Sequence, residues 1–224
     1  MAATHDYTEP IYKPDKICAF YFDPKKKVYL MQHLLMPYSK TIVPFAWWEG
    51  AFTNQELDWL QQKAKEATQE AQIGGLNGGR SNDEIRRSEL NWLHKDSECA
   101  WVFERLAHVA ATLNAEHFGF ELTGFGEAIQ LTNYHEARQG TYVWHQDFGS
   151  SGISRKLSMV LQLSEPNEYE GGELQLLTNK NPTSIQKKRG LITVFPAWTL
   201  HQVTPVIKGT RQTLVTWVSG PAFK

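Results

Sequence analysis

The second half of the chain alternates apolar and polar residues with a period of two, the pattern of half-buried β-strands. Turn-forming pairs such as Gly171-Gly172, Arg189-Gly190 and Lys208-Gly209 separate the alternating segments. The strands expected on this basis are residues 127–134, 139–144, 156–163, 173–177, 184–187, 191–195, 201–206 and 211–219. Eight short, closely spaced strands predict two antiparallel sheets in a jelly roll, or double-stranded β-helix.

Two helices are expected before the strands. Thr53 and Glu56 form a capping box, which predicts that a helix begins there. Its apolar stripe is Leu57, Leu60, Ala64, Ala67 and Ala71, and Gly74-Gly75 is expected to end it. A second helix is predicted over residues 98–117 from the stripe Val102 or Phe103, Leu106, Ala110 and Leu113. The predicted fold class is therefore mainly β with α, with helices buttressing one sheet.

A chain of 224 residues without an evident linker predicts a single domain over residues 1–224. Residues 1–125 are expected to be a helical and irregular support region, and residues 126–219 the β-helix core. Within the support region, residues 1–14 are interpreted as an extended arm and residues 16–43 as two strands joined by a polar turn. The glycine-rich segment 74–79 is interpreted as a loop, because no Lys-Ser/Thr follows it as in a P-loop.

Charge and composition narrow the classes of partner. The formal net charge is −1 and the pI is near 6.7, so no overall positive field favours nucleic acid or an anionic membrane. No signal peptide is recognisable, and no apolar run approaches the roughly 20 residues that span a bilayer. The two cysteines form no CxxC pair. These features predict a soluble, cytoplasmic protein, and nothing in them indicates an oligomeric state.

The pattern His145-x-Asp147, followed far along the chain by His201, indicates a metal site. Side chains two apart on a strand lie on the same face, so His145 and Asp147 can share one ion. His201 begins the next-to-last predicted strand, which in a jelly roll lies close to the second. Two imidazoles and one carboxylate form the facial triad that holds non-haem Fe(II) with positions left open. We therefore predict that these three residues bind iron.

Arg211 is the second strong indicator of chemistry. With Thr213, Val215 and Trp217 it forms one face of the last predicted strand, and that face is expected to point inward. An arginine on an inward face is costly to bury without an anion, and its planar guanidinium pairs well with a carboxylate. We predict that Arg211 binds the far carboxylate of 2-oxoglutarate and that Thr213 adds a hydroxyl donor.

The first predicted strand carries Tyr134 on a polar face with Ala128, Gln130 and Thr132, whereas Ile129 and Leu131 point the other way. Tyr134 and Tyr142 could each donate a phenol hydrogen bond to the co-substrate; the alternative for both is aromatic packing. His94, His108 and His117 have no ligand spacing and are interpreted as surface or packing histidines. Arg86, Arg87 and segment 74–79 are candidates for substrate contact.

A purely structural interpretation stays open at this point. In it, His145 and His201 are satisfied core histidines, Asp147 caps a turn, and Arg211 pairs with Glu127 or Glu173. A second alternative is a non-catalytic, cupin-like module that binds a metal or ligand without turnover. Such a module has no need of Arg211.

The last hundred residues resemble the 2-oxoglutarate and Fe(II)-dependent oxygenase superfamily, in its prolyl-4-hydroxylase-like branch, and are most similar to PKHD-type hydroxylases. The resemblance is carried by Trp144-His145-Gln146-Asp147, by the segments 157–166 and 169–174, and above all by 200–206 with Gly209-Thr210-Arg211. It implies a double-stranded β-helix with iron on His145, Asp147 and His201 and 2-oxoglutarate on Arg211. Animal-type prolyl hydroxylases usually carry lysine at this last position, and their tyrosine lies about two residues closer to the first ligand than Tyr134 does.

The resemblance also implies a reaction. A dioxygenase of this kind uses Fe(II), 2-oxoglutarate and O2, with ascorbate as an optional reductant, to hydroxylate an organic substrate. The presence of Asp147 favours hydroxylation, because halogenases of the superfamily lack that carboxylate. A peptidyl residue such as proline is the first candidate substrate, and a free amino acid or small metabolite is the alternative. Nucleic acid is disfavoured, because demethylases of the superfamily typically carry an arginine where Trp217 stands.

Overall fold

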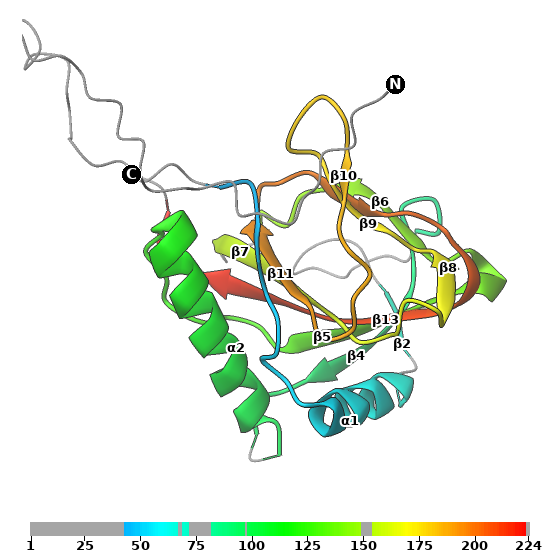
Figure 1. Cartoon of the computed structure of the whole chain (residues 1–224), viewed down its shortest axis with the longest axis horizontal. Coiled ribbons are helices and arrows are strands. Elements are labelled where there is room, and N and C mark those ends of the chain that lie inside the picture. Colours follow the sequence, from blue (N-terminus) through cyan, green and yellow to red (C-terminus); the bar gives the residue numbers. More distant parts are fainter. Residues whose placement is uncertain (1–42, 67–68, 72–81, 97, 149–153, 223–224) are drawn as a thin grey trace, which may run out of the picture. The chain divides into compact units, whose positions relative to one another are not determined.

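A computed structural model describes residues 43–66, 69–71, 82–96, 98–148 and 154–222 (Figure 1). All of them belong to one compact unit, Lys40–Lys224. The predicted arm, the two strands expected between residues 16 and 43, and the glycine-rich segment 74–79 lie outside the described residues. The single-domain prediction therefore stays a prediction.

Helix α1 (Asn54–Lys65) begins where the sequence predicts. The Thr53 side chain accepts a hydrogen bond from the Glu56 backbone, and the Glu56 carboxylate accepts one from the Thr53 backbone. The helix buries Leu57, Leu60 and Ala64. The prediction that it continues to Gly74 is wrong: it ends at Lys65, and Ala71 is buried beyond it, next to strand β2 (Gln69–Glu70). Gln69 and Glu70 pair with β4 as a strand, so the helix cannot continue through them.

Helix α2 (Ala100–Leu113) continues into a π-helical turn, Asn114–Phe118, which ends at left-handed Gly119. The apolar residues predicted to face the core are buried, and Val109 is buried as well. The buried residues of α2 are Val102, Phe103, Leu106, Val109, Ala110 and Leu113. Both helices pack on the larger of two sheets through one apolar cluster, which includes Ile129 and Leu131 as expected (Figure 1). None of the helices in the described residues is long and apolar enough to cross a membrane.

The strands form two antiparallel sheets. The larger has the order β1 (Ala46–Trp48), β11 (Ile192–Pro196), β7 (Arg155–Gln162), β13 (Val206–Ser219), β5 (Ile129–His135), β4 (Glu89–Leu93) and β2, and β8 (Tyr169–Gly171) also pairs with β13. The smaller has the order β10 (Thr183–Ser184), β9 (Leu174–Leu176), β12 (His201–Val203), β6 (Thr141–His145) and β3 (Arg86–Arg87). This is the arrangement of a jelly roll.

Seven of the eight predicted strands overlap well with observed ones, whereas the prediction for residues 184–187 shares only Ser184 with β10, and one predicted turn is wrong. Lys208-Gly209 does not separate two strands, because β13 runs without interruption from Val206 to Ser219. Pairing of β8 with Val206–Gly209 extends the strand, and Gly209 absorbs the bend with a φ of +74°. Strands β1, β2, β3, β4 and β8 were not predicted. They are two to five residues long.

Leu106 tests how much the helices contribute to stability. It is fully buried between α2 and the larger sheet, so Leu106→Ala should lower the free energy of unfolding by about 2–5 kcal/mol. Urea unfolding followed by circular dichroism measures this. Glu104→Ala, at an exposed position of the same helix, should change it by less than about 0.5 kcal/mol. Similar losses for the two variants would contradict this account of the core.

Candidate active site

The pairing of β12 with β6 places two of the predicted metal ligands opposite each other. His201 on β12 is the direct partner of His145 on β6. Asp147 lies just beyond the end of β6, where its backbone N–H donates to the carbonyl of Ala197 at 2.8 Å. Residues far apart in sequence therefore meet at one end of the smaller sheet.

The three side chains form a compact cluster. Their candidate ligand atoms all lie within 4.8 Å of one another, and within the described residues this is the one such group. His145 Nε2 lies 3.8 Å from Asp147 Oδ1, and His201 Nε2 lies 3.4 Å from Asp147 Oδ2. Asp147 and His201 are buried, and His145 is partly buried. The structure thus brings together the three residues that the sequence singled out.

Hydrogen bonds orient each group. His145 Nδ1 lies 2.7 Å from the carbonyl of Val143, and His201 Nδ1 lies 2.9 Å from the carbonyl of Thr199. A carbonyl can only accept, so each Nδ1 carries the proton and each Nε2 is free to bind a metal. The Ser158 hydroxyl donates to Asp147 Oδ2 at 2.8 Å. The remaining lone pairs of the carboxylate face the two imidazoles.

Burial and mutual charge shift the pKa values of the three side chains in different directions. Burial is the main cause that lowers the pKa of His145 to about 4, with the nearby His201 adding to it. His145 is therefore neutral at neutral pH, as a ligand must be. Burial alone would raise the pKa of Asp147, but the charge and hydrogen bond of His201 hold it well below its usual range. Burial opposes the protonation of His201, yet Asp147 raises its pKa.

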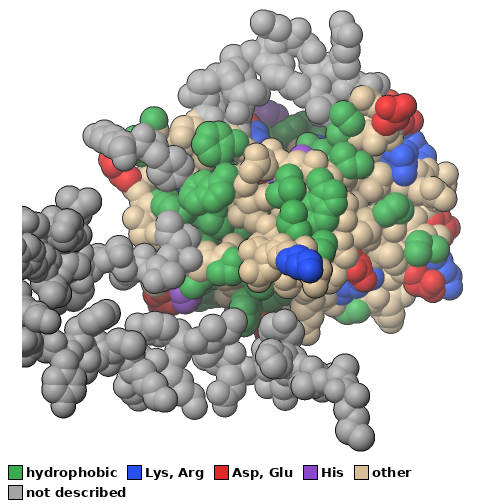
Figure 2. All heavy atoms as spheres, turned by 90° about the horizontal axis from the view of Figure 1, so that it is seen from above, with side chains coloured by type: hydrophobic (Ala, Val, Ile, Leu, Met, Phe, Trp, Pro, Cys, Tyr) green, Lys and Arg blue, Asp and Glu red, His purple; other side chains and the backbone are tan. Residues whose placement is uncertain are grey.

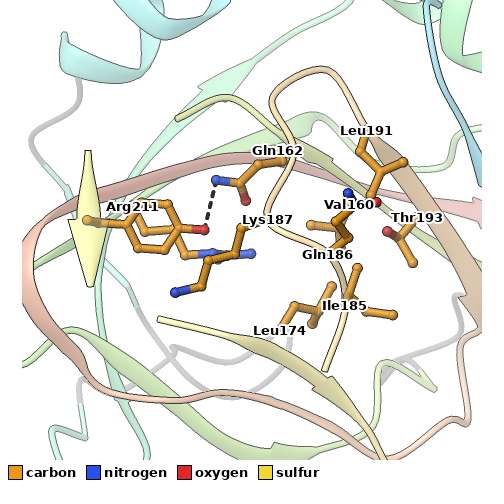
Figure 3. Close-up of a pocket in the computed structure, with 10 residues that line it drawn as sticks. Val160, Gln162, Leu174, Ile185, Gln186, Lys187, Leu191, Thr193 and Arg211 are labelled. Carbon is orange, nitrogen blue, oxygen red and sulfur yellow. Dashed lines mark hydrogen bonds between the residues drawn. The ribbon is translucent and has the colours of Figure 1, made fainter. Parts of the chain in front are cut away.

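Arg211 lies in a pocket between the sheets (Figure 3). Only 3% of the residue is exposed, and its Nε has no hydrogen-bond partner among the described residues. The Thr213 hydroxyl, on the same face of β13, is also buried without a partner there. The other residues lining this pocket are Val160, Gln162, Tyr169, Leu174, Ile185, Gln186, Lys187, Leu191 and Thr193. No acid lines the pocket, so the unsatisfied Arg211 Nε there, with the unsatisfied Thr213 hydroxyl two residues along β13, forms a cradle for an anion.

The pocket and the metal cluster both lie against the inner face of the larger sheet. Val160 lines the pocket, and Ser158, two residues away on β7, binds Asp147. Thr193 lines the pocket, and Phe195, two residues away on β11, packs against the His201 ring at 4.8 Å. Side chains two apart on a strand point the same way and lie about 7 Å apart. A small elongated ligand could therefore reach both sites.

Of the two predicted tyrosines, Tyr134 is buried and Tyr142 is partly buried, and both lie beside these groups. The Tyr134 ring lies 5.5 Å from the Arg211 guanidinium carbon, and Tyr142 stacks on His145 with 3.4 Å between ring centroids. Tyr142 and His145 are three residues apart, which would place them on opposite faces of a regular strand. An extra residue in β6 between the pairs His201–His145 and Val203–Tyr142 brings both side chains to the inner face.

Several pocket residues were missed from the sequence. The Tyr169 hydroxyl accepts a hydrogen bond from Gln162, and its pKa is raised by burial although Arg211 opposes the rise (Figure 3). Lys187 lies over the Tyr169 ring and donates to the carbonyl of Gly171. The segment Tyr169-Glu170-Gly171-Gly172 was recognisable, but no periodic signal placed it against Arg211. A Cβ on Gly172 would lie 2.8 Å from Val206 and 3.1 Å from Arg211, so the turn there requires glycine.

The structural alternatives for Arg211 do not hold. Glu127 binds Arg155 through two hydrogen bonds, and Glu173 binds Gln175 and Ser184. Of the remaining histidines, His94 and His108 are exposed and His117 is partly buried, and none of them joins the metal cluster. A purely structural interpretation would therefore leave a buried arginine uncompensated. The donor set and the unsatisfied groups fit an iron ion with an adjoining dicarboxylate.

Comparison with known proteins now bears on the site. Residues 129–219 match the model of the 2OG-Fe(II) oxygenase superfamily. This part of the chain resembles that superfamily. A PKHD-type hydroxylase of Prochlorococcus marinus is 39% identical over 83 residues, which is 37% of this chain and 38% of that protein. One of Saccharophagus degradans is 45% identical over 66 residues, 30% of this chain and 29% of that protein. The chain thus spans less than two fifths of these relatives.

Solved structures show the fold over a longer stretch. A Pseudomonas putida prolyl-4-hydroxylase superposes with a TM-score of 0.61 at 17% identity, covering 80% of this chain and 94% of that one. A Trichoplax adhaerens prolyl hydroxylase in complex with a hypoxia inducible factor peptide fragment superposes with a TM-score of 0.65 at 16% identity. The match covers 79% of this chain and 84% of that one. These similarities confirm the predicted double-stranded β-helix with its helices.

The lowered pKa of His145 predicts how the stability of the metal-free protein depends on pH. Between pH 6.5 and about 4 the unfolded chain protonates this imidazole and the folded chain does not. The free energy of unfolding should therefore fall as the pH falls through this window, by up to about 1.4 kcal/mol per pH unit from this group. Urea unfolding at pH 7 and pH 5 should show a smaller decrease for His145→Gln than for wild type. Equal decreases would contradict the shift.

Proposed function

We propose that this protein is an Fe(II)- and 2-oxoglutarate-dependent dioxygenase that hydroxylates an organic substrate, first of all a peptidyl residue such as proline. The observation that carries the proposal is the convergence of His145, Asp147 and His201 beside the uncompensated guanidinium of Arg211. The matches to the oxygenase superfamily and to PKHD-type hydroxylases support it.

In this proposal His145 and His201 bind iron through Nε2 and Asp147 binds through a carboxylate oxygen. The carbonyls of Val143 and Thr199 hold the imidazole planes, and Ser158 holds the carboxylate. Arg211, with Thr213 beside it, binds the far carboxylate of 2-oxoglutarate, and Tyr134 packs against that guanidinium. Tyr142 stacks on His145 and limits its rotation. When bound, iron and 2-oxoglutarate activate O2, so that a substrate C–H becomes C–OH while succinate and CO2 form.

The remaining residues exclude water and keep the pocket rigid. Phe195 and Leu176 are fully buried next to His201, and Val160 and Leu174 complete the apolar wall between the ligands and Arg211. A dry wall strengthens each charge-assisted hydrogen bond inside it. The pairing of Gln162 with Tyr169 orders the polar end of the pocket.

A peptidyl substrate is supported by the surface beside the metal ligands. Val143 and Phe148 flank the sequence that carries His145 and Asp147, and 37% and 53% of these residues are exposed. Figure 2 shows apolar side chains gathered near the middle of one face, with charged groups mostly toward its edges. The Trichoplax adhaerens relative was solved with a peptide, which supports a protein or peptide partner here. A free amino acid or small metabolite remains the alternative substrate class.

We further propose that the protein acts in the cytoplasm as one oxygenase domain. Cys99 is a free thiol, and burial, together with the nearby Asp96, raises its pKa and keeps it protonated. Such a thiol is inert and suits a reducing compartment, where iron also stays ferrous.

Succinate formation from 2-oxoglutarate, with and without Fe(II), tests the proposed activity. Arg211→Gln should raise the KM for 2-oxoglutarate by about 100-fold or more, because one partner of a buried charge pair is lost. Its affinity for the metal should stay within about threefold of wild type, as it does not touch the ligands. Lys208→Gln removes an exposed positive charge from the same strand and should change neither value.

His145→Ala should abolish turnover in the same assay, and a chelator should reproduce that loss in wild type. Anaerobic addition of Fe(II) and 2-oxoglutarate should also give a weak visible charge-transfer band. Turnover that persists without iron would refute the proposal. Absence of the band from protein that has bound Fe(II) would instead favour the non-catalytic binding module.

A further inference from the structure

Arg86 is a second buried arginine near the metal ligands. Only 7% of this residue is exposed, and its Nε donates to the Ser88 hydroxyl at 2.9 Å. No carboxylate among the described residues lies within ion-pair distance of it. A buried guanidinium without an anion is costly, so its presence requires a compensating partner.

The other arginines of the described residues show how unusual this is. Arg105, Arg138, Arg155 and Arg189 each bind at least one carboxylate. Arg87, next to Arg86 on β3, binds three backbone carbonyls. Arg86 and Arg211 are the two most buried, and in the described part of the chain they are the two without an acid or a carbonyl partner.

The position of Arg86 places its charge at the candidate active site. Arg86 pairs with Tyr142 across β3 and β6, and Tyr142 pairs with Val203 on β12, so the three side chains share one face of the smaller sheet. That face is the inner one, because Val203 packs in a buried cluster with Tyr134. The Arg86 guanidinium carbon lies 4.7 Å from the centroid of the Tyr142 ring, which stacks on His145. One aromatic ring therefore contacts both Arg86 and a metal ligand.

Arg86 and Arg211 occupy separate sites. The pocket that contains Arg211 is not lined by Arg86, Tyr142 or any metal ligand. In the proposed function, 2-oxoglutarate places one carboxylate at the iron and the other at Arg211. The co-substrate then has no acid left for Arg86.

Resting on the proposed function, we propose that Arg86 binds a carboxylate of the substrate, so that the enzyme selects acidic molecules. The recognised group is a carboxylate, either the free α-carboxylate of a small acid or the side chain of an acidic residue beside the one hydroxylated. Tyr142 separates this carboxylate from the metal and orients the guanidinium by a cation–π contact. Arg86 acts as a specificity-determining residue.

Binding to protein loaded with Zn(II) and saturated with 2-oxoglutarate tests this without turnover. Two matched probe pairs are titrated by calorimetry. N-acetyl-L-proline against its amide probes a free α-carboxylate, and N-acetyl-L-glutamate α-amide against N-acetyl-L-glutamine amide probes a side-chain acid. At least one acid should bind ten times more tightly than its own amide, because charge-assisted hydrogen bonds to a guanidinium are strong. Which acid binds identifies the source of the carboxylate.

Arg86→Gln should remove this preference, lowering the affinity for the preferred acid at least tenfold and leaving that for the amide unchanged. Arg86→Lys, which keeps the charge, should restore part of it. Arg105→Gln is the matched control, because Arg105 already pairs with Glu56. This variant should bind the acids and amides as tightly as wild type does. In wild type the Arg86 Nε–H signal in spectra of 15N-arginine protein should shift with the acid only. In Arg86→Gln the signals of the other arginines should stay at their wild-type positions, which reports that the fold is intact.

Two results would overturn the inference: both acids bind no better than their amides, or Arg86→Gln binds the preferred acid as tightly as wild type does. Neither depends on catalysis. If Arg86 binds the acid but the protein forms no succinate, the site stands and the proposed function fails. If succinate forms and neither acid is preferred, the function stands and the site fails.

Discussion

The antiparallel register of β12 against β6 is the constraint on which the candidate site depends. It sets His201 opposite His145, and the backbone hydrogen bond from Asp147 to Ala197 fixes the third side chain beside them. Backbone pairing thus determines the distances among three ligands that no local sequence preference could bring together. The side-chain hydrogen bonds from Ser158 and to Val143 and Thr199 then fix orientation. Together they supply rigid support of the kind that a metal site needs.

The interior of this fold divides into two chemical regions. One side of the larger sheet packs on α1 and α2 through a continuous apolar cluster and provides the stability. Its other side faces the smaller sheet and carries a mixture of apolar and polar groups, among them Thr213, Gln162 and Arg211, and the buried Arg86 lies on the inner face of the smaller sheet. Natural proteins accept unsatisfied or uncompensated groups mainly where a ligand completes them. The concentration of such groups between the two sheets therefore separates the region for binding from the region that provides stability.

Much of this arrangement could be predicted from the sequence. The period of two located seven strands, the capping box located the start of α1, and the spacing of His145, Asp147 and His201 identified the metal cluster. Arg211 could be assigned an inward direction because alternation fixes which side of a strand a residue occupies. The early end of α1 could not be predicted, since it follows from pairing of β2 with a strand far along the chain. The roles of Tyr169 and Lys187 depend on tertiary contacts around Arg211, and local periodicity contains no information about those. Arg86 was a candidate for substrate contact from the sequence, but its position beside Tyr142 could not be predicted.

The additional residue in β6 has a consequence for how this chain can vary. Because it turns Tyr142 to the same side as His145, deleting one residue at position 143 or 144 would send the phenol outward and separate it from Arg86. Loops between strands tolerate changes of length, so the distance in sequence from Asp147 to His201 is free to drift among descendants. The spacing of three residues from Tyr142 to His145 cannot change in this way, because any change would turn one of the two side chains away from the site.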